Sequence, residues 1–322
     1  MARAPDGYLH RRRPSDRRSP TRRLSRPTLT PGRRASARPT TAADVASAAQ
    51  LACLLEASAP KPGNVAPAAH THFRDTRYDH FLASAAAIGP AFLLSKRRSL
   101  GTTIRDACAA TARWTSTNTN LGIILLLAPL ARAALDAQGG TLRERVVRVL
   151  GRTTVRDAAK VYAAIRLTRP GGLGRTDEQD VAGAPTLALR AVMALAADRD
   201  GIAREYATDF AVTFELGAPT LDRARRDGLS WDDAIVETYL TLLAGVPDTL
   251  VARKLGEAAA ADISRRSRNV LAAGGVRSAA GRRRTAALDR ALRDDSNARN
   301  PGTTADLTAA AIFVVLLEGG WS

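Results

Sequence analysis

The chain of 322 residues is long enough to bury a sizeable core in one large domain or two small ones. Its aromatic content is only 4%, so we expect a core of small aliphatic side chains on closely packed helices. The net charge of +17 is high enough to suggest nucleic-acid binding, so the distribution of that charge along the chain has to be examined.

Most of the basic charge belongs to residues 1–40. Twelve arginines against two aspartates give this segment a charge of +10, which leaves +7 for residues 41–322. The segment is rich in Arg, Pro and Ser and lacks the apolar content needed to fold, so we predict a disordered tail. A nucleic-acid-binding arm, a targeting segment and an upstream extension of the reading frame all stay open. A secretory signal is not expected, because there is no apolar stretch of the required kind.

From Thr41 onward the apolar residues recur with helical spacing, and no segment alternates as a strand would. The prediction is an all-α fold, with residues 41–322 forming one domain of about twelve helices. In chain order the expected helices are 42–58, 78–98, 103–114, 119–137, 141–150, 154–168, 185–198, 201–216, 231–244, 247–262, 283–293 and 303–318. Residues 265–284 are rich in Arg, Ser, Gly and Ala and are predicted to be a mobile surface connection.

Capping signals support these helix starts. A Ser or Thr is followed three residues later by an acid at Thr41, Thr103, Thr141, Thr154, Ser230 and Thr303. Gly or Pro marks the stops at Pro60, Gly139-Gly140, Pro170-Gly171, Gly245 and Gly319-Gly320.

The cysteines and the apolar runs indicate where the protein is found. Cys53 and Cys108 lie in apolar helical patterns without metal-ligand spacing, so we expect buried thiols in a reducing compartment rather than a disulfide. The apolar runs 123–130 and 312–317 are far shorter than the roughly 20 residues that span a bilayer. We therefore expect a soluble, cytoplasmic protein that does not enter a membrane.

Four polar, Gly-containing junctions interrupt the helical patterns. They are residues 59–65, 116–122, 170–180 and 300–307. Thr or Asn before an apolar run is ordinary helix capping, so the stretch 116–122 alone favours a cap over a ligand site. The recurrence of the pattern at four places shifts the balance towards a site.

These junctions, in this order, resemble the ATP:dephospho-CoA triphosphoribosyltransferase family from about Leu51 to Glu318. The residues that carry the resemblance are Lys61-Pro62-Gly63, His70 with Asp75, Asn118-Thr119 with Gly122, Gly171-Gly172, Asp248-Thr249 with Arg253 and Lys254, and Asn300-Pro301-Gly302 with Ala305-Asp306-Leu307. The resemblance implies transfer of a 5-triphosphoribosyl group from ATP to the 2′-hydroxyl of dephospho-CoA, with release of adenine. The product would be the precursor of a prosthetic group.

The chain departs from the family pattern at two places. Family members commonly have Asn-Thr-His-Lys-Gly where this chain has Asn118 to Gly122, and an acid often stands where Ala66 does. The lost Lys and His remove a cation and a titratable group from a site for a triphosphate. The chain therefore resembles a divergent branch, and its acceptor could be another cofactor, such as a methanopterin-type one-carbon carrier.

Cleavage of a ribosyl C1–N bond needs a proton donor for adenine, a base for the incoming hydroxyl and cations for the triphosphate. Lys61 lies between two prolines and before Gly63, which suits a phosphate contact; a solvated Lys at a helix exit is the alternative. Arg253 and Lys254 are further candidate phosphate ligands, or else an ordinary exposed helix face.

The candidate acids are Asp177, Glu178 and Asp180, with Asp75 as a second metal or base position. Asp177 and Asp180 are the candidate ligands of Mg²⁺, the cofactor that we expect for the substrate ATP. Acids at a helix start are also favoured by the helix dipole, so a purely structural role stays open. The three nearby histidines, His70, His72 and His80, lack zinc-site spacing, and no zinc is predicted.

The remaining candidates would contact the nucleotide or the acceptor: Asn118, Asn120, Gly171, Gly172 and Asp306. For Asp306 a structural capping box with Thr303 is favoured over a substrate contact. The expected partners are ATP with dephospho-CoA or a related acceptor, and a homodimer is left open. The alternatives are a nucleic-acid-binding protein, which we do not expect because base-stacking residues are scarce, a helical scaffold without catalysis, and a nucleosidase-like reaction.

Overall fold

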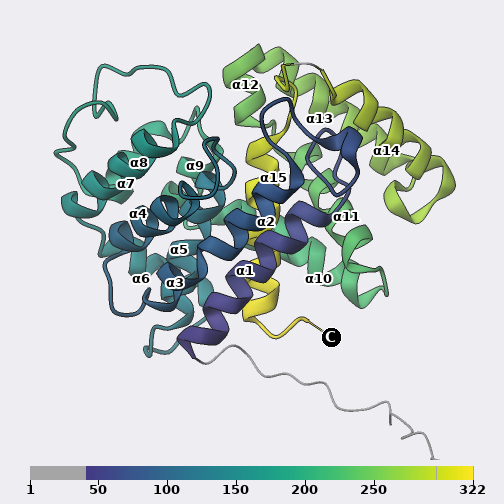
Figure 1. Cartoon of the computed structure of the whole chain (residues 1–322). Helices are drawn as coiled ribbons and strands as arrows, with labels where there is room; N and C mark the ends of the chain where they lie inside the picture. Colours follow the sequence, from purple (N-terminus) through teal and green to yellow (C-terminus); the bar gives the residue numbers. More distant parts are fainter. Residues whose placement is uncertain (1–40, 295, 322) are drawn as a thin grey trace, which may run out of the picture. The chain divides into compact units, whose positions relative to one another are not determined.

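The computed structural model describes residues 41–294 and 296–321, so the predicted tail at residues 1–40 lies outside the described residues. The described part is helical and contains no strand, which confirms the all-α prediction (Figure 1). Its α-helices are α1 (Ala42–Ser58), α2 (Tyr78–Ala87), α3 (Gly89–Leu93), α4 (Leu100–Thr111), α5 (Leu121–Ala134), α6 (Leu142–Gly151), α7 (Val155–Thr168), α8 (Leu189–Ala196), α9 (Gly201–Ala207), α10 (Ala218–Arg226), α11 (Trp231–Gly245), α12 (Thr249–Leu255), α13 (Glu257–Ala272), α14 (Ala279–Leu292) and α15 (Gly302–Leu317). Short 3₁₀ turns occupy Ala69–Thr71 and Gly275–Arg277, and a π-helix occupies Thr213–Gly217.

Most of the predicted helix starts are confirmed by their caps. Thr41, Thr141 and Thr154 each form a full capping box with the acid three residues later, and the Ser230 hydroxyl accepts from the Asp233 amide. The start predicted at Thr103 is wrong, because α4 begins three residues earlier behind the N-cap Ser99. These caps satisfy amides that have no intrahelical partner, and so they fix where the chain enters each helix.

Three predicted helices are broken in the structure. The helix expected over 78–98 divides at Ile88, directly before Gly89-Pro90 at the start of α3, into α2 and α3. The helix expected over 201–216 ends at Ala207 and is followed by the π-helix. The helix expected over 247–262 divides at Gly256, whose φ of +90° falls in the region that favours glycine.

The prediction of a mobile connection over residues 265–284 is wrong. Helix α13 continues to Ala272 and α14 begins at Ala279, so most of this segment is helical. Its buried face includes Ser267 and Val270, which pack with α11. The arginines lie on the exposed side of these helices, and composition alone concealed the apolar face.

Helix α15 lies at the centre of the core. It contacts α1, α5 and α11, and nearly all of its residues from Leu307 to Leu317 are buried (Figure 1). Both cysteines are buried free thiols, as predicted, and burial raises the pKa of each. Among the described helices none is by itself long and apolar enough to cross a membrane, although the bent pair α11 and α12 meets the criteria of length and composition.

Candidate active site

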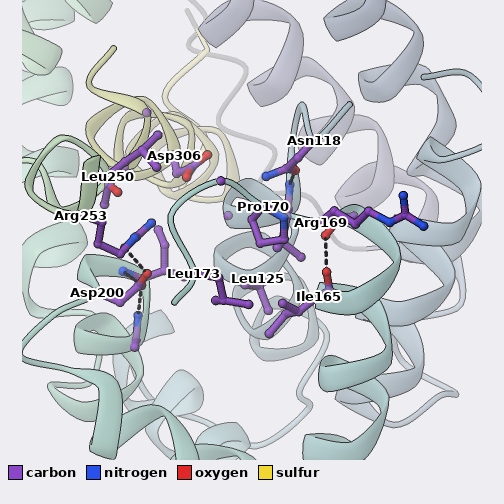
Figure 2. A pocket seen from close by; sticks show the side chains of 18 of the residues that line it. Asn118, Leu125, Ile165, Arg169, Pro170, Leu173, Asp200, Leu250, Arg253 and Asp306 are labelled. Carbon is purple, nitrogen blue, oxygen red and sulfur yellow. Dashed lines mark hydrogen bonds and ion pairs between the residues drawn. The ribbon is translucent and has the colours of Figure 1, made fainter. Parts of the chain in front are cut away.

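A cavity of about 590 Å³ opens where the N-terminal ends of α5, α12 and α15 face the loop that follows α7 (Figure 2). Its inner wall is apolar and includes Leu125, Ile165 and Met193. Its outer wall is polar and includes parts of three of the four junctions singled out in the sequence, with Asn64 from the fourth. A concave site with one apolar wall and a few converging polar groups is the usual form of a small-molecule site.

The loop after α7 forms because the helix is ended by a specific cap. Arg169 has a left-handed conformation (φ 47°), and its amide donates to the Ile165 carbonyl oxygen at 3.0 Å. Pro170 cannot extend the helix, so the chain turns away through Gly171, which lines the cavity. Gly172 has a positive φ and lies against the Arg253 side chain, outside the lining residues.

The two asparagines predicted to contact the nucleotide have different environments. The Asn118 Oδ1 atom accepts the Leu121 amide at 3.0 Å, while its amide group has no partner among the described residues. Asn120 is only 4% exposed, and its Nδ2 donates to the Thr111 hydroxyl at 3.2 Å. Both line the cavity, but only the Asn118 amide is available to a ligand.

Asp306 projects from α15 into the cavity (Figure 2). The predicted capping box with Thr303 is wrong: α15 begins at Gly302 behind Pro301, and the Thr303 hydroxyl pairs with Thr249 at 3.1 Å. No hydrogen bond or ion pair joins the Asp306 carboxyl to any described residue. Gly122 leaves room for it, because a Cβ atom there would lie 2.0 Å from Asp306 Oδ2.

Burial raises the pKa of Asp306 well above its usual range, and the neighbouring charges of Glu56, Asp248 and Asp200 raise it further. The residue retains some exposed surface because the carboxyl faces the cavity, yet protein surrounds it on the other sides. The carboxyl therefore holds its proton at a pH where an exposed aspartate would be ionised.

Lys61 is neither solvated nor among the residues that line the cavity. It is 1% exposed, its ammonium lies 3.1 Å from Glu56 Oε1, and it also donates to the Glu56 and Ala59 carbonyl oxygens. Glu56 Oε1 lies within ion-pair distance of Lys61 but lacks the geometry of a hydrogen bond. The two charged groups still attract each other at this distance, because charge attraction does not require hydrogen-bond alignment. Lys61 thus neutralises a buried acid whose carboxylate lines the cavity.

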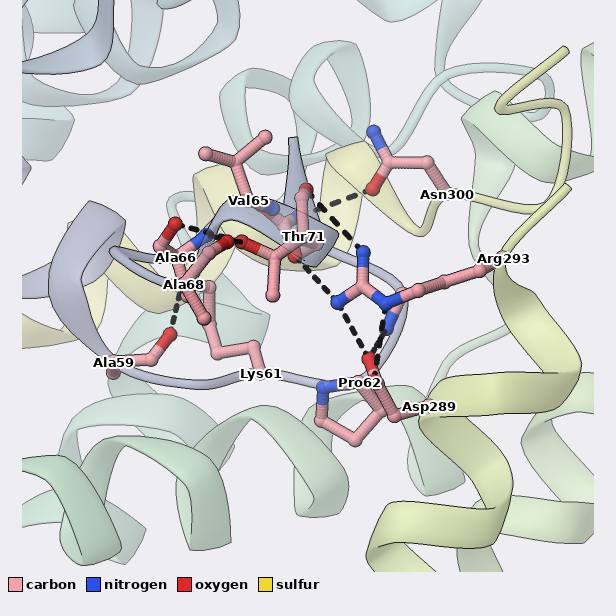
Figure 3. A network of polar contacts seen from close by, with 12 residues as sticks. Ala59, Lys61, Pro62, Val65, Ala66, Ala68, Thr71, Asp289, Arg293 and Asn300 are labelled. Atoms are coloured by element: carbon pink, nitrogen blue, oxygen red, sulfur yellow. Dashed lines mark hydrogen bonds and ion pairs between the residues drawn. The ribbon is translucent and has the colours of Figure 1, made fainter. Parts of the chain in front are cut away.

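The loop around Lys61 is held by a polar network, the loop network, made of residues 59–71 with Asp289, Arg293 and Asn300 (Figure 3). The Gly63 amide donates to Asp289 Oδ1 at 2.8 Å, and Arg293 donates to the Asn64 and Thr71 carbonyl oxygens at 3.0 and 3.3 Å. At Gly63 φ is +72°, and a Cβ atom would meet Leu292 at 2.7 Å. Glycine is therefore required at position 63 by the conformation of the loop and its packing against Leu292.

Two cations on α12 border the cavity. Arg253 Nη1 pairs with Asp200 Oδ2 at 2.6 Å (Figure 2). Lys254 Nζ donates to the Asn297 carbonyl oxygen at 3.4 Å. Burial lowers the pKa of Lys254, while Asp248 opposes that change. Both residues lie where the resemblance expects phosphate ligands.

The candidate acids in the loop after α7 do not form a cluster of metal ligands. Asp177 is exposed and lies outside the cavity lining, whereas Glu178 and Asp180 line it. The Asp180 oxygens accept the Thr176 and Ala182 amides at 2.9 and 2.8 Å. Asp75 lines the cavity on the opposite loop. No group of three His, Cys, Asp or Glu residues suited to a metal ion occurs among the described residues.

Sequence reasoning missed two acids that line the cavity, Glu56 and Asp200, and it gave no role of its own to Asp248, which it named only as part of the family resemblance. Asp248 Oδ1 caps α12, while its Oδ2 accepts the Thr304 amide of α15 at 2.7 Å, so one buried carboxylate joins two helix starts. Asp200 caps α9. A signal was available for Glu56, because it lies on the otherwise apolar face of α1.

Comparisons with known proteins agree with the resemblance seen in the sequence. The model of the family described as ATP:dephospho-CoA triphosphoribosyl transferase matches residues 42–322. A relative from Stutzerimonas stutzeri, "Probable 2-(5''-triphosphoribosyl)-3'-dephosphocoenzyme-A synthase", is 30% identical over 86% of this chain and 92% of its own. A relative of the same name from Pseudomonas paraeruginosa is 40% identical over 38% of this chain, and that match spans less than half (42%) of the relative.

A solved structure from Archaeoglobus fulgidus has the same fold. It is described as a "putative triphosphoribosyl-dephospho-coA synthase", and it is 34% identical to this chain, with a TM-score of 0.59. The superposition covers 75% of this chain and all of the solved one.

Proposed function

The chain belongs to the ATP:dephospho-CoA triphosphoribosyl transferase family, and we propose that it transfers the triphosphoribosyl group of ATP to a hydroxyl of dephospho-CoA with release of adenine. The observation that carries the proposal is the Asp306 carboxyl, which lines the cavity without a hydrogen bond or ion pair to any described residue and whose pKa is raised by burial. Cations on α12 border the same cavity, so a proton donor and phosphate ligands share one site. The family match does not favour the nucleic-acid-binding and scaffold alternatives.

Asp306 is the proposed proton carrier of the reaction. As the ribose C1′–N9 bond of ATP breaks, its electron pair passes to the adenine ring, and Asp306 donates its proton to an adenine ring nitrogen. The acceptor hydroxyl then forms the new C1′–O bond, and its proton returns to the Asp306 carboxylate. Atoms and charges balance, and the Asp306 carboxyl is protonated again at the end of the reaction.

The positive character that develops on the ribose requires nearby negative charge. Glu56 lines the cavity and interacts electrostatically with Asp306. It is 2% exposed and retains its partner Lys61. We assign Glu56 to stabilisation of the ribosyl cation and Lys61 to holding the Glu56 carboxylate in place, a positioning role rather than a phosphate contact.

The triphosphate is assigned to the polar wall. Arg253 and Lys254 supply positive charge, and the backbone amides of Gly122 and Ile123 at the start of α5 have no acceptor among the described residues. The N-terminal amides of a helix favour bound anions. The Asn118 amide group lies beside them and could donate to ribose or phosphate oxygens.

The residues predicted to bind Mg²⁺ do not fit that ion as they are placed. Asp180 uses its oxygens on backbone amides, and Asp177 lies outside the cavity lining. Mg²⁺ in nucleotide enzymes is held largely by substrate phosphates and by only one or two carboxylates. We therefore expect any Mg²⁺ to arrive on the triphosphate of ATP, and no step above depends on it.

The departure from the family pattern at residues 120–121 bears on the acceptor. Leu121 belongs to the core, and Asn120 is tied to Thr111, so neither supplies the cation that a Lys or His would. The family match nevertheless favours dephospho-CoA over the methanopterin-type acceptor considered from the sequence.

The test of the proposed function is adenine release. The full chain is incubated with ATP and Mg²⁺, with and without dephospho-CoA, and adenine and the condensed product are identified by chromatography and mass. Adenine together with a product of the summed mass supports the transfer. Adenine without that product would indicate hydrolysis, and no adenine release in the presence of dephospho-CoA would contradict the proposal.

A further inference from the structure

A second hollow, of about 560 Å³, borders the main cavity. It is lined by His70, His72, Phe73, Arg74, Arg293, Asp294 and Asn297. Phe73 and Asn297 line both spaces, so the two are neighbours along the same face. The hollow lies between the loop before α2 and the segment after α14, which the loop network joins.

Its charged groups divide into those that are engaged and those that are available. Arg293 is committed to Asp289 and to two carbonyl oxygens, and Asp294 accepts several amides of the segment that follows it. In contrast, the His72 Nε2 atom is buried and has no hydrogen-bond partner. His70 and Arg74 likewise make no hydrogen bond or ion pair with the described residues. The available groups include the Arg74 guanidinium, which is a cation and a hydrogen-bond donor, and two imidazole rings, each of which carries at least one N–H donor.

A buried ring nitrogen without a partner is uncommon, because buried polar atoms are usually satisfied by protein, water or a ligand. Imidazole and guanidinium groups are the side chains that bind phosphate oxygens in charge-assisted hydrogen bonds. The hollow therefore offers side chains of the kinds that bind a phosphate group.

Asn297 lines both the main cavity and the second hollow. Lys254 Nζ, one of the proposed triphosphate ligands, donates to the Asn297 carbonyl oxygen, so the two candidate phosphate sites are adjacent. The reaction under Proposed function joins two polyphosphate-bearing molecules, whose charges repel unless each set is neutralised. We propose that the second hollow binds the diphosphate of the acceptor while the ATP triphosphate occupies the main cavity. This assignment rests on the proposed function.

The test is equilibrium binding to the full chain, measured by calorimetry for dephospho-CoA and ATP separately. His72→Phe keeps the ring but removes its nitrogens, Arg74→Ala removes the guanidinium, and Arg156→Ala is the matched control on the exposed face of α7. Each hollow variant is expected to weaken dephospho-CoA binding about tenfold and to leave ATP binding within about twofold. The control should bind both as the wild type does, and thermal unfolding should be unchanged in all three.

The other outcomes contradict the assignment in distinct ways. An equal loss of ATP affinity would place the ATP triphosphate in the hollow. Unchanged dephospho-CoA affinity in both variants, or no binding by the wild type, would exclude the hollow as the acceptor's site. If binding depends on His72 and Arg74 but no adenine is released, the proposed function fails and the hollow stands. If adenine is released but dephospho-CoA binding does not depend on His72 and Arg74, the proposed function stands and the hollow is not the acceptor's site.

Discussion

The loop network and the polar wall of the cavity contain the same kinds of residue in opposite situations. In the network, Gly63, Lys61 and Arg293 each have partners within the protein (Figure 3). In the wall, the Asp306 carboxyl and the Asn118 amide have none among the described residues and face the cavity (Figure 2). The paired groups of the network stabilise a loop, whereas the unpaired groups of the wall can bind or react with a ligand.

The difference follows from burial. A buried loop has to satisfy its polar groups internally, because an unpaired one costs about 1–3 kcal/mol. A cavity wall can leave groups unpaired, because water or substrate satisfies them. Substitutions in the two regions should therefore separate stability from activity.

The largest effect is expected for Asp306→Asn. The amide keeps the shape but carries no transferable proton, so kcat for adenine release should fall by about 10²–10⁴-fold. Folding should not suffer, because the variant removes a carboxyl whose ionisation is disfavoured by burial. Steady-state kinetics beside thermal unfolding test this expectation, and retention of full activity would remove Asp306 from the mechanism.

The contribution of Asp306 to the free energy of unfolding should also depend on pH. Its pKa is raised on folding, so between the ordinary aspartate pKa of about 3.9 and the raised value the folded state binds the proton more tightly than the unfolded state. The free energy of unfolding contributed by this residue therefore falls as pH rises through that window. The melting temperature of Asp306→Asn relative to wild type should be higher at pH 7 than at pH 4, and a constant difference would contradict the shift.

Lys61→Met should affect the loop network rather than the polar wall of the cavity. It leaves Glu56 buried without its partner, so the free energy of unfolding should fall by about 3–5 kcal/mol. Adding Glu56→Leu should restore most of that loss, although activity should not return. Denaturant unfolding measures both, with Lys96→Met on the exposed surface as a control expected to change less than about 0.5 kcal/mol. A stable single variant that fails only to bind ATP would restore the phosphate role predicted from the sequence.

Arg253→Ala should have an intermediate effect within the wall. Loss of one charged contact to the triphosphate should raise the KM for ATP about tenfold, with kcat reduced less. Arg223→Ala, on the exposed side of α10, is the matched control. A change confined to kcat would show that Arg253 acts on the transition state rather than on ground-state binding.

The smallest effect is expected for Asp177→Asn. Asp177 is exposed and lies outside the cavity lining, so activity should stay within about twofold of wild type, by adenine release. A hundredfold loss would mean that the loop after α7 moves over the bound substrates and brings Asp177 to them.

Local chemistry was enough to predict the all-α class and most helix starts. Thr41, Thr141 and Thr154 act with an acid three residues away, so sequence spacing determines the cap. The breaks at Gly89-Pro90 and Gly256, and the helices across 265–284, escaped prediction. The two breaks come from Gly and Pro, which are local signals that outweigh the helical spacing of the apolar residues. The helices across 265–284 depend on the packing of their apolar face against α11.

The sequence by itself determined the elements and the places where polar residues interrupt them. Only the tertiary structure decided which interruptions face the cavity, because Gly63 and Gly122 look alike in the chain yet one meets Leu292 and the other makes room for Asp306. It also brought Glu56 to Lys61 and Asp248 to Thr304. The physical reason is that a polar group's role depends on whether a partner lies within hydrogen-bond reach, and such partners come from residues up to 236 positions away.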